Sequence, residues 1–219
     1  MNNQRRAIIF VNGEIHNYAA ASAILEEGDF LVAADGGLYH MKQLGLKPAL
    51  LVGDMDSLLD TELSEINASQ TEILQYPTDK DETDLELALQ TVLDRGYRTI
   101  RIMGALGGRL DQMLGNTLLL TRPSLIECDV TLDDGEVEVF IIRRSAVIAG
   151  SPGDTISLLP WDGPARSIVT EGLKYPLRAE TLWPDRTRGI SNQMLAERAS
   201  VRLSAGKILC IHIRKELEK

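Results

Sequence analysis

The first half of this 219-residue chain alternates between two kinds of segment, and that alternation restricts its fold more than any other feature. Short, continuous apolar runs are typical of strands buried on both faces of a sheet, and they occupy residues 7–11, 30–34, 49–53, 72–76 and 99–105. Stretches with helical periodicity lie between and after them, at roughly 18–27, 37–44, 59–68, 84–95 and 109–120. This alternation predicts right-handed crossovers and a parallel, Rossmann-like sheet covered by helices on both faces.

The pattern changes after about Ser124. Strand-like segments follow one another, separated by the turn signals DDG, SPGD, WDGP and SAGK, and the one helical feature expected is a turn near 192–197. We therefore expect an α/β domain over residues 1–125 and an all-β sandwich domain over residues 130–219.

The segment YPTDKDETDLELAL, residues 76–89, concentrates negative charge: Lys80 lies among Asp79, Asp81, Glu82, Asp84 and Glu86. One interpretation is an ordinary helix start, with Thr83 as N-cap and Glu86 completing a capping box. The other is a cation site, because two carboxylates about 4 Å apart repel by roughly 4 kcal/mol at an effective dielectric of 20. A favourable helix dipole offsets only about 0.3–1 kcal/mol per carboxylate.

Acidic loops recur after other expected strands, as AADGG at 33–37, VGDMDS at 52–57 and GALGGRLDQ at 104–112. All of them follow the carboxyl ends of parallel strands, which is the edge where open α/β sheets bind ligands. The candidate ligand atoms are carboxylate oxygens without histidine or cysteine, a set that favours Mg²⁺ over Ca²⁺ or Mn²⁺. Because Mg²⁺ completes its shell with water and substrate phosphates, the acidic edge also becomes a candidate phosphate site.

The glycine pairs in two of these loops fit the same interpretation. Gly36-Gly37 and Gly107-Gly108 lack Cβ atoms, so their N–H groups can approach a polyphosphate closely, and Arg109 offers a bidentate fork. The alternative is a set of tight turns beside a surface arginine. No GxxxxGK[ST], no GxGxxG after the first strand and no GxSxG is present, which leaves chemistry dominated by metal and position, as in phosphoryl transfer.

Charge and composition narrow the class of partner. A formal net charge of −9 argues against nucleic acid and anionic membranes as partners. No apolar run approaches 18 residues, and Cys128 and Cys210 show no metal-ligand spacing, so we expect a soluble cytoplasmic protein with free thiols.

Together, ADGG, GDMDS, DKDETDLELAL and GALGGRLDQ, followed by TEGLKYPL and GISNQ, resemble the thiamine pyrophosphokinase (thiamine diphosphokinase) family over essentially the full chain. The resemblance implies conversion of ATP and thiamine into AMP and thiamine diphosphate, with Mg²⁺, by an α/β domain followed by a β-sandwich. It also implies a homodimer in which each thiamine site combines the α/β domain of one subunit with the β domain of the other.

The resemblance also implies roles for single residues. Expected metal ligands are Asp54, Asp56, Asp81 and Asp84, and the expected catalytic residues are Asp56, Asp81, Asp84 and Arg109. Residues expected to contact ATP or thiamine are Asp35, Gly36, Gly37, Ser57, Lys80, Thr83, Gly107, Gly108, Asp111, Tyr175, Ser191 and Asn192. The chain departs from the pattern at Leu38-Tyr39, where many members read Ala-Asn, and at Met55, where Phe is common.

Two other functions remain open from the residues themselves. A Mg²⁺-dependent nucleotide phosphohydrolase would share the acidic strand ends but would consume ATP without thiamine. A non-catalytic thiamine- or nucleotide-binding protein would bind both ligands and leave ATP intact.

Overall fold

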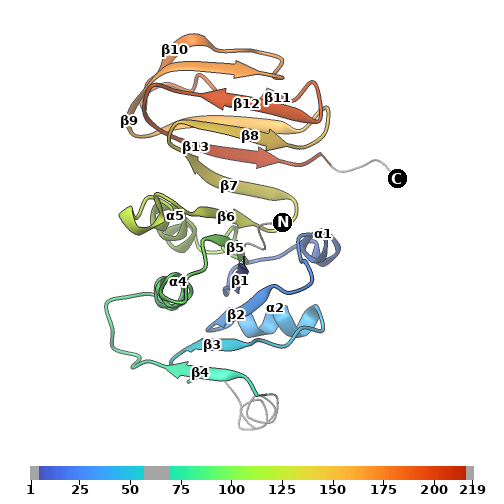
Figure 1. Ribbon diagram of the computed structural model, residues 1–219, viewed down its shortest axis with the longest axis vertical. Coiled ribbons are helices and arrows are strands. Elements are labelled where there is room, and N and C mark those ends of the chain that lie inside the picture. The colour runs from blue at the N-terminus through green and yellow to red at the C-terminus, as the bar shows by residue number, and fades with distance from the viewer. Residues whose placement is uncertain (1–4, 57–69, 216–219) are drawn as a thin grey trace. The chain divides into compact units, whose positions relative to one another are not determined.

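The computed structural model describes residues 5–56 and 70–215, which belong to two compact units, Met1–Gly135 and Glu136–Lys219 (Figure 1). The expected helix at 59–68 and the candidate residue Ser57 lie outside the described residues. Among the described helices, none combines the length and apolar character needed to cross a bilayer.

The first unit is built on a parallel sheet with the strand order β4-β3-β2-β1-β5-β6. The parallel sheet expected from the sequence is therefore confirmed. Its strands are β1 (Arg6–Phe10), β2 (Phe30–Ala34), β3 (Leu50–Gly53), β4 (Glu72–Gln75), β5 (Thr99–Met103) and β6 (Asp129–Asp133).

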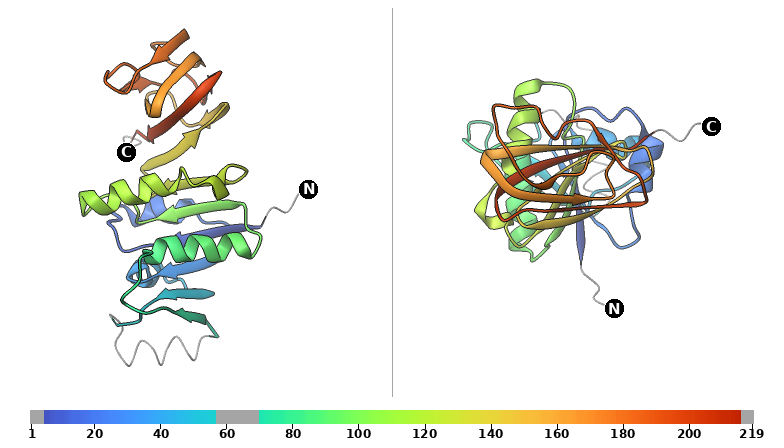
Figure 2. Two further views of the ribbon diagram at one scale, coloured as in Figure 1. Left: turned by 90° about the vertical axis from the view of Figure 1, so that its left-hand side faces the viewer. Right: turned by 90° about the horizontal axis from the view of Figure 1, so that it is seen from above.

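Helices cover both faces of this sheet. Helices α1 (Tyr18–Ala23) and α2 (Gly37–Gln43) lie on one side, and α4 (Asp84–Asp94) and α5 (Leu110–Leu119) lie on the other (Figures 1 and 2). The central strand β1 is enclosed between the layers, and Ile8, Ile9 and Phe10 are fully buried there. This two-sided burial explains why the strands read as continuous apolar runs rather than as alternating ones.

Helix α4 begins where its sequence predicts. The hydroxyl of Thr83 accepts a hydrogen bond of 3.2 Å from the backbone N–H of Glu86, which is the first half of a capping box. The carboxylate of Glu86 instead pairs with Arg122 Nη1 at 2.8 Å. The apolar side of the helix, including Leu85 and Leu89, packs into the core.

The sixth strand differs from expectation. The segment DVTLDDGEVEVF resembles an antiparallel hairpin, and the predicted boundary at 125–130 assigned all of it to the β domain. In the structure β6 pairs parallel to β5, with Val130 opposite Ile100, and the first unit extends to Gly135. The reason is that β5 has an open edge that β6 fills, a long-range pairing that local alternation does not encode.

The second unit is rich in β-structure. Strand β9 (Thr155–Glu171) pairs through its first half with β13 (Ala205–Ile213) and through its second half with β10 (Arg178–Leu182) and β12 (Arg198–Arg202). The remaining strands are β7 (Val137–Ile142) beside β13, β8 (Ser145–Ala149) beside β12, and β11 (Asn192–Gln193) beside β9. Buried side chains from both groups of strands, among them Leu158, Ile168 and Val201, form one core cluster.

The turn predicted at WDGP is a bend inside β9 rather than a chain reversal. Asp162 and Gly163 have φ values of 58° and 147°, and the register between β9 and β13 shifts near this point. The strand continues past the irregularity, which lets one long strand belong to two sheets.

Candidate functional site

A cavity of about 820 Å³ lies in the first unit, at the carboxyl ends of β1, β2 and β5. The strand order reverses there: β2, β3 and β4 extend to one side of β1, and the chain then returns to place β5 on the other side. A crevice at such a reversal is where open α/β sheets bind their ligands. The volume is in the range of small-molecule and cofactor sites.

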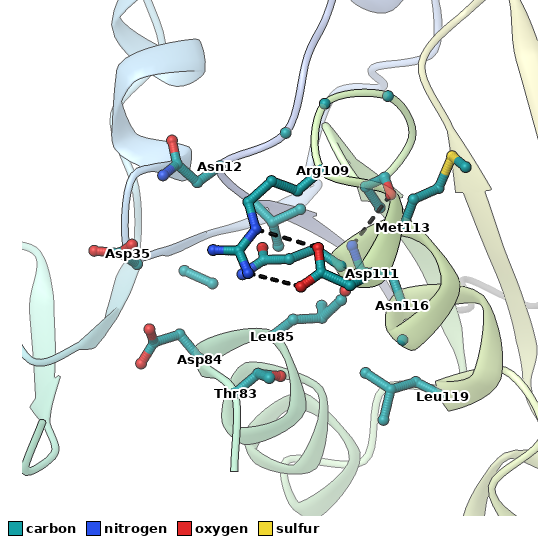
Figure 3. A pocket seen from close by; sticks show the side chains of 18 of the residues that line it. Asn12, Asp35, Thr83, Asp84, Leu85, Arg109, Asp111, Met113, Asn116 and Leu119 are labelled. Atoms are coloured by element: carbon teal, nitrogen blue, oxygen red, sulfur yellow. Dashed lines mark hydrogen bonds and ion pairs between the residues drawn. The ribbon is translucent and has the colours of Figure 1, made fainter. Parts of the chain in front are cut away.

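The described lining of the cavity is strongly acidic. It includes five carboxylates and one arginine: Glu14, Asp35, Asp84, Glu86, Asp111 and Arg109. Figure 3 shows Asp35, Asp84 and Arg109 around the same hollow. A polyanionic ligand would be repelled by this lining unless a cation accompanied it, so the site suits a ligand that arrives with a metal ion.

The loop between β5 and α5 places backbone N–H groups beside the cavity. Gly107 and Gly108 have φ values of 81° and 71°, a left-handed conformation that only glycine adopts without strain. The loop ends at Arg109, the N-cap of α5, and its side chain makes no cap hydrogen bond. The amino end of α5 can therefore bind an anion with its first N–H groups.

Arg109 and Asp111 face each other in this structure (Figure 3). The guanidinium donates from Nε to Oδ1 at 3.2 Å and from Nη2 to Oδ2 at 2.7 Å. The hydrogen bond to Arg109 holds the pKa of Asp111 below its usual value, and the same bond raises the pKa of Arg109. Both side chains are exposed, so a phosphate can compete with Asp111 for the two N–H donors of the Arg109 guanidinium.

Asp84 provides the test of whether a cation fits. Its Oδ1 is buried and receives no hydrogen bond, although Lys80 Nζ lies 2.9 Å away as an ion-pair partner outside hydrogen-bonding geometry. A carboxylate oxygen that receives no hydrogen bond, on a residue that lines a cavity with other carboxylates, is a suitable type of ligand for a hard cation. Within residues 5–56 and 70–215, no three His, Cys, Asp or Glu side chains are grouped closely enough to hold a metal by themselves. This arrangement fits Mg²⁺, which binds through one or two carboxylates and completes its shell with substrate and water.

The glycines of the ADGG motif have a packing role. A Cβ on Gly37 would lie 1.9 Å from the carbonyl oxygen of Phe10, and one on Gly36 would lie 2.4 Å from the side chain of Asn12. Helix α2 therefore begins directly against the end of β1. Ala34 and Asp35 of this motif are among the described lining residues and its two glycines are not; Asp35 is in a left-handed conformation with φ 46°.

The other acidic candidates lie outside the described lining of the cavity. Asp54 follows β3, where its Oδ1 accepts a hydrogen bond of 3.0 Å from the N–H of Asp56. The carboxylate of Asp56 accepts a bond of 2.7 Å from Thr78, in the loop after β4. Asp81 is exposed in that loop, so the roles of these three residues stay predictions.

Several lining residues carry functional groups that the sequence interpretation passed over. The segment after β1 contributes Asn12 and Glu14, and α5 contributes Asn116. Asn116 donates to the carbonyl of Ala105 at 3.1 Å and so ties α5 to the glycine loop. The sequence did contain a signal for Asn12 and Glu14. In VNGE, polar residues follow directly after a buried strand, and ligands bind at the carboxyl ends of strands in this kind of sheet.

The candidates of the second unit cluster around one backbone segment. The side chain of Asn192 is buried, accepts from the N–H of Tyr175 at 3.0 Å and donates to the carbonyl of Tyr175 at 2.7 Å. Ser191 has φ 58°, and its N–H donates to Ser157 Oγ at 3.0 Å. Tyr175 is 56% exposed, and Lys174 Nζ lies 5.7 Å from the centroid of its ring, so Asn192 holds the backbone while the tyrosine side chain stays accessible.

Two family models match separate parts of the chain, one in each unit. Residues 21–132 match the family described as "Thiamin pyrophosphokinase, catalytic domain", and residues 141–208 match "Thiamin pyrophosphokinase, vitamin B1 binding domain". The chain is 27% identical over 188 residues to thiamine pyrophosphokinase of Bacillus subtilis (strain 168), covering 85% of this chain and 88% of that protein.

Solved structures agree with the fold. The crystal structure of the Bacillus subtilis thiamine pyrophosphokinase superposes with a TM-score of 0.86 at 25% identity, covering 96% of this chain and all of that one. A thiamin pyrophosphokinase family protein from Enterococcus faecalis gives a TM-score of 0.81 at 26% identity, with coverage of 97% and 100%.

Proposed function

Because this chain belongs to the thiamine pyrophosphokinase family, we propose that it transfers the diphosphoryl group of ATP to the hydroxyl of thiamine. The hydroxyl oxygen bonds to the β-phosphorus, the bond from that phosphorus to the oxygen of the α-phosphate breaks, and AMP leaves. The observation that carries this proposal is the acidic cavity at the strand-order reversal, beside a glycine loop and an open helix amino end.

We place the polyphosphate of ATP at the loop 104–108 and the amino end of α5. Gly107 and Gly108 present N–H groups there without the obstruction of a side chain. Arg109 exchanges its bond to Asp111 for a phosphate oxygen and shares the negative charge that develops during transfer.

Magnesium belongs to the proposal as the cation that accompanies ATP. Asp84 would hold it through its free Oδ1, with Asp54, Asp56 and Asp81 as the further ligands expected from the family motifs. When bound, the ion neutralises phosphate charge and aligns the attacking and leaving oxygens. Asp84 and Asp56 are the two candidate acceptors of the hydroxyl proton.

Thiamine is proposed to use the second unit. The exposed ring of Tyr175 suits stacking on a cationic thiazolium or on a pyrimidine, a contact worth roughly 0.5–2 kcal/mol. Asn192 would act through Tyr175, because its side-chain amide is already bonded to that backbone. Ser191 is the adjacent candidate for a direct contact.

The quaternary state and the finer fold labels are part of the same proposal. We propose a homodimer with shared sites, a Rossmann-like first domain, a β-sandwich second domain and a cytoplasmic location. The strand order with its central reversal supports the Rossmann-like description. Exposed Leu110, Leu114 and Leu118, spaced four residues apart on α5, support an association surface.

The test is phosphorus NMR of the purified protein with ATP and Mg²⁺, with and without thiamine. AMP and thiamine diphosphate appearing together, and only when both thiamine and Mg²⁺ are present, is the expected result. ADP and free phosphate formed without thiamine would identify a phosphohydrolase. ATP left intact despite measured binding of both ligands would identify a binding protein. The comparisons favour neither alternative.

A further inference from the structure

His40 is a buried histidine of α2 for which the proposed chemistry has no use. Its side chain is bonded on both ring nitrogens: Tyr18 Oη lies 2.7 Å from Nδ1, and the carbonyl oxygen of Gly13 lies 2.7 Å from Nε2. The residue is only 5% exposed, so water does not substitute for these partners.

The two partners determine the direction of both hydrogen bonds. A carbonyl oxygen only accepts, so Nε2 carries the proton and donates to Gly13. Burial lowers the pKa of His40, although the bond to Gly13 acts in the opposite direction, and the ring is therefore neutral near pH 7. In a neutral ring Nδ1 accepts, so the Tyr18 hydroxyl donates to it.

The ring stands where two cavity loops meet. The N–H of Gly13 donates to the carbonyl of Gly104 at 2.8 Å, and a Cβ on Gly13 would lie 2.1 Å from that same oxygen. A Cβ on Gly104 would lie 3.3 Å from Cδ2 of His40 and 2.6 Å from the carbonyl oxygen of Val11. Segments 11–14 and 104–108 both contribute to the cavity lining, and His40 packs against their junction.

We infer that His40, oriented by Tyr18, is a positioning residue that sets the placement of these two loops for nucleotide binding. The inference rests on the proposed function, because it places the phosphates of ATP on the loop 104–108. His40 lies just after Leu38-Tyr39, where the chain departs from the family pattern, so the motifs themselves do not assign it this role.

Two matched hydroxyl deletions provide the sharpest test. Tyr18→Phe removes the donor that orients His40, whereas Tyr97→Phe removes a hydroxyl bonded to Arg5 at 2.8 Å, just before the amino end of β5 and away from the cavity. We expect Tyr18→Phe to raise the KM for ATP about threefold and to leave the KM for thiamine unchanged. Tyr97→Phe should alter neither constant. Equal behaviour of the two variants would overturn the inference.

Substitutions of His40 itself should have a larger effect on the ATP constants, and one of them should restore most of the activity that the other loses. His40→Phe keeps the ring volume and loses both bonds, and we expect kcat/KM for ATP to fall by about 10- to 100-fold. His40→Gln retains an N–H donor for Gly13 and should recover much of that loss. If the Phe variant stays within twofold of the parent in its ATP constants, the ring only fills space.

Nitrogen NMR of the imidazole tests the geometry without relying on catalysis. We expect one protonated and one unprotonated nitrogen in His40 at pH 7, and two protonated nitrogens would contradict the assignment. Calorimetry of Mg·ATP binding to Tyr18→Phe and Tyr97→Phe extends the loop test. If the parent protein makes no thiamine diphosphate, the proposed function fails. The imidazole NMR and the calorimetry do not depend on catalysis, so they still test whether His40 positions the two loops.

Discussion

At the scale of single residues, the proposed metal site depends on Asp84, whose buried Oδ1 receives no hydrogen bond. Lys80 Nζ lies 2.9 Å from this oxygen as an ion-pair partner, outside hydrogen-bonding geometry. Such a group is costly to a protein unless it serves a ligand, because buried polar atoms are nearly always paired.

Asp84→Asn therefore tests the proposed metal site directly. The amide keeps the size of the side chain and removes its charge, so we expect turnover to fall by at least about 100-fold with little change in Tm. Steady-state assays and thermal melts measure the two quantities. Glu82→Gln is the matched control, because Glu82 is an exposed neighbour with no assigned role. Turnover near that of the parent in Asp84→Asn would remove this carboxylate from the mechanism.

At the scale of elements, the two helices beside the cavity differ at their amino ends. Thr83 caps α4 through the N–H of Glu86, whereas Arg109 leaves α5 without a side-chain cap. The first N–H groups of α5 are thus left available for the anion that we propose binds there, since uncapped N–H groups bind anions.

Gly108→Ala and Gly45→Ala form a matched pair for this loop. Both positions are left-handed, with φ values of 71° and 67°, so each alanine should destabilise the fold by roughly 1–2 kcal/mol. Only Gly108 lines the cavity, so only Gly108→Ala should also weaken Mg·ATP binding, by about tenfold. Calorimetry and denaturant titration separate the two effects. Equal ATP affinities in the two variants would move the phosphates away from this loop.

Strand β13 contains a second buried histidine with a different chemistry. His212 is fully buried, with Nδ1 3.2 Å from Glu138 and Nε2 2.8 Å from Asp154. Burial opposes the charged ring, but the bonds to these two carboxylates prevail and raise the pKa of His212. Burial likewise opposes the charge of Asp154, whose pKa is lowered by the N–H of Lys215, by His212 and by the N–H of Ser151.

The second unit should therefore be most stable in mildly acidic solution. The raised pKa of His212 adds stability that is complete below its ordinary value of 6.5 and is lost as pH rises through the folded-state value. The lowered pKa of Asp154 adds stability that is present above 3.8 and is lost as pH falls below it. Urea unfolding followed by the fluorescence of Trp161 and Trp183 reports this unit, which contains both tryptophans.

Two histidine variants complete the pH experiment. His212→Gln should remove the decline of unfolding free energy above pH 6.5, because it no longer titrates there. His16→Gln changes an exposed histidine of the first unit and should leave the decline in place. A decline that persists in His212→Gln would assign the pH dependence to another group.

At the scale of the whole molecule, charge divides unevenly between the units. The first carries 22 acidic and 10 basic residues, a net −12, and the second carries 10 and 13, a net +3, which together make −9. In the homodimer that we propose, opposite net charges on the two units would favour pairing of unlike units between the two copies. The exposed leucines of α5 add apolar area on the helix that also lines the cavity.

Leu114→Glu tests this surface. If the proposed dimer uses this surface, a charge in the middle of the leucine row should weaken dimerisation by at least about 30-fold, whereas Leu114→Met keeps the surface apolar and should leave dimerisation unchanged. Sedimentation velocity across a range of protein concentrations measures both. A dimer of unchanged affinity in Leu114→Glu would place the interface elsewhere.

Local sequence was enough to locate most elements and the acidic strand ends. Apolar runs and helical periodicity depend on neighbours in the chain, so β1, β2, α4 and α5 begin and end close to their predicted positions. The motifs likewise pointed to Asp35, Asp84, Gly107 and Arg109, which all line the cavity.

Only the tertiary structure decided which residues meet. Strand pairing joined β6 to β5 and gave Glu14 a place in the cavity, while Asp56 turned to the loop after β4. It also placed His40 against Gly13 and Gly104, which belong to two loops that are distant in the chain. The physical reason is that strand order and loop contacts are set by long-range packing, whose free energy depends on partners that no local pattern specifies.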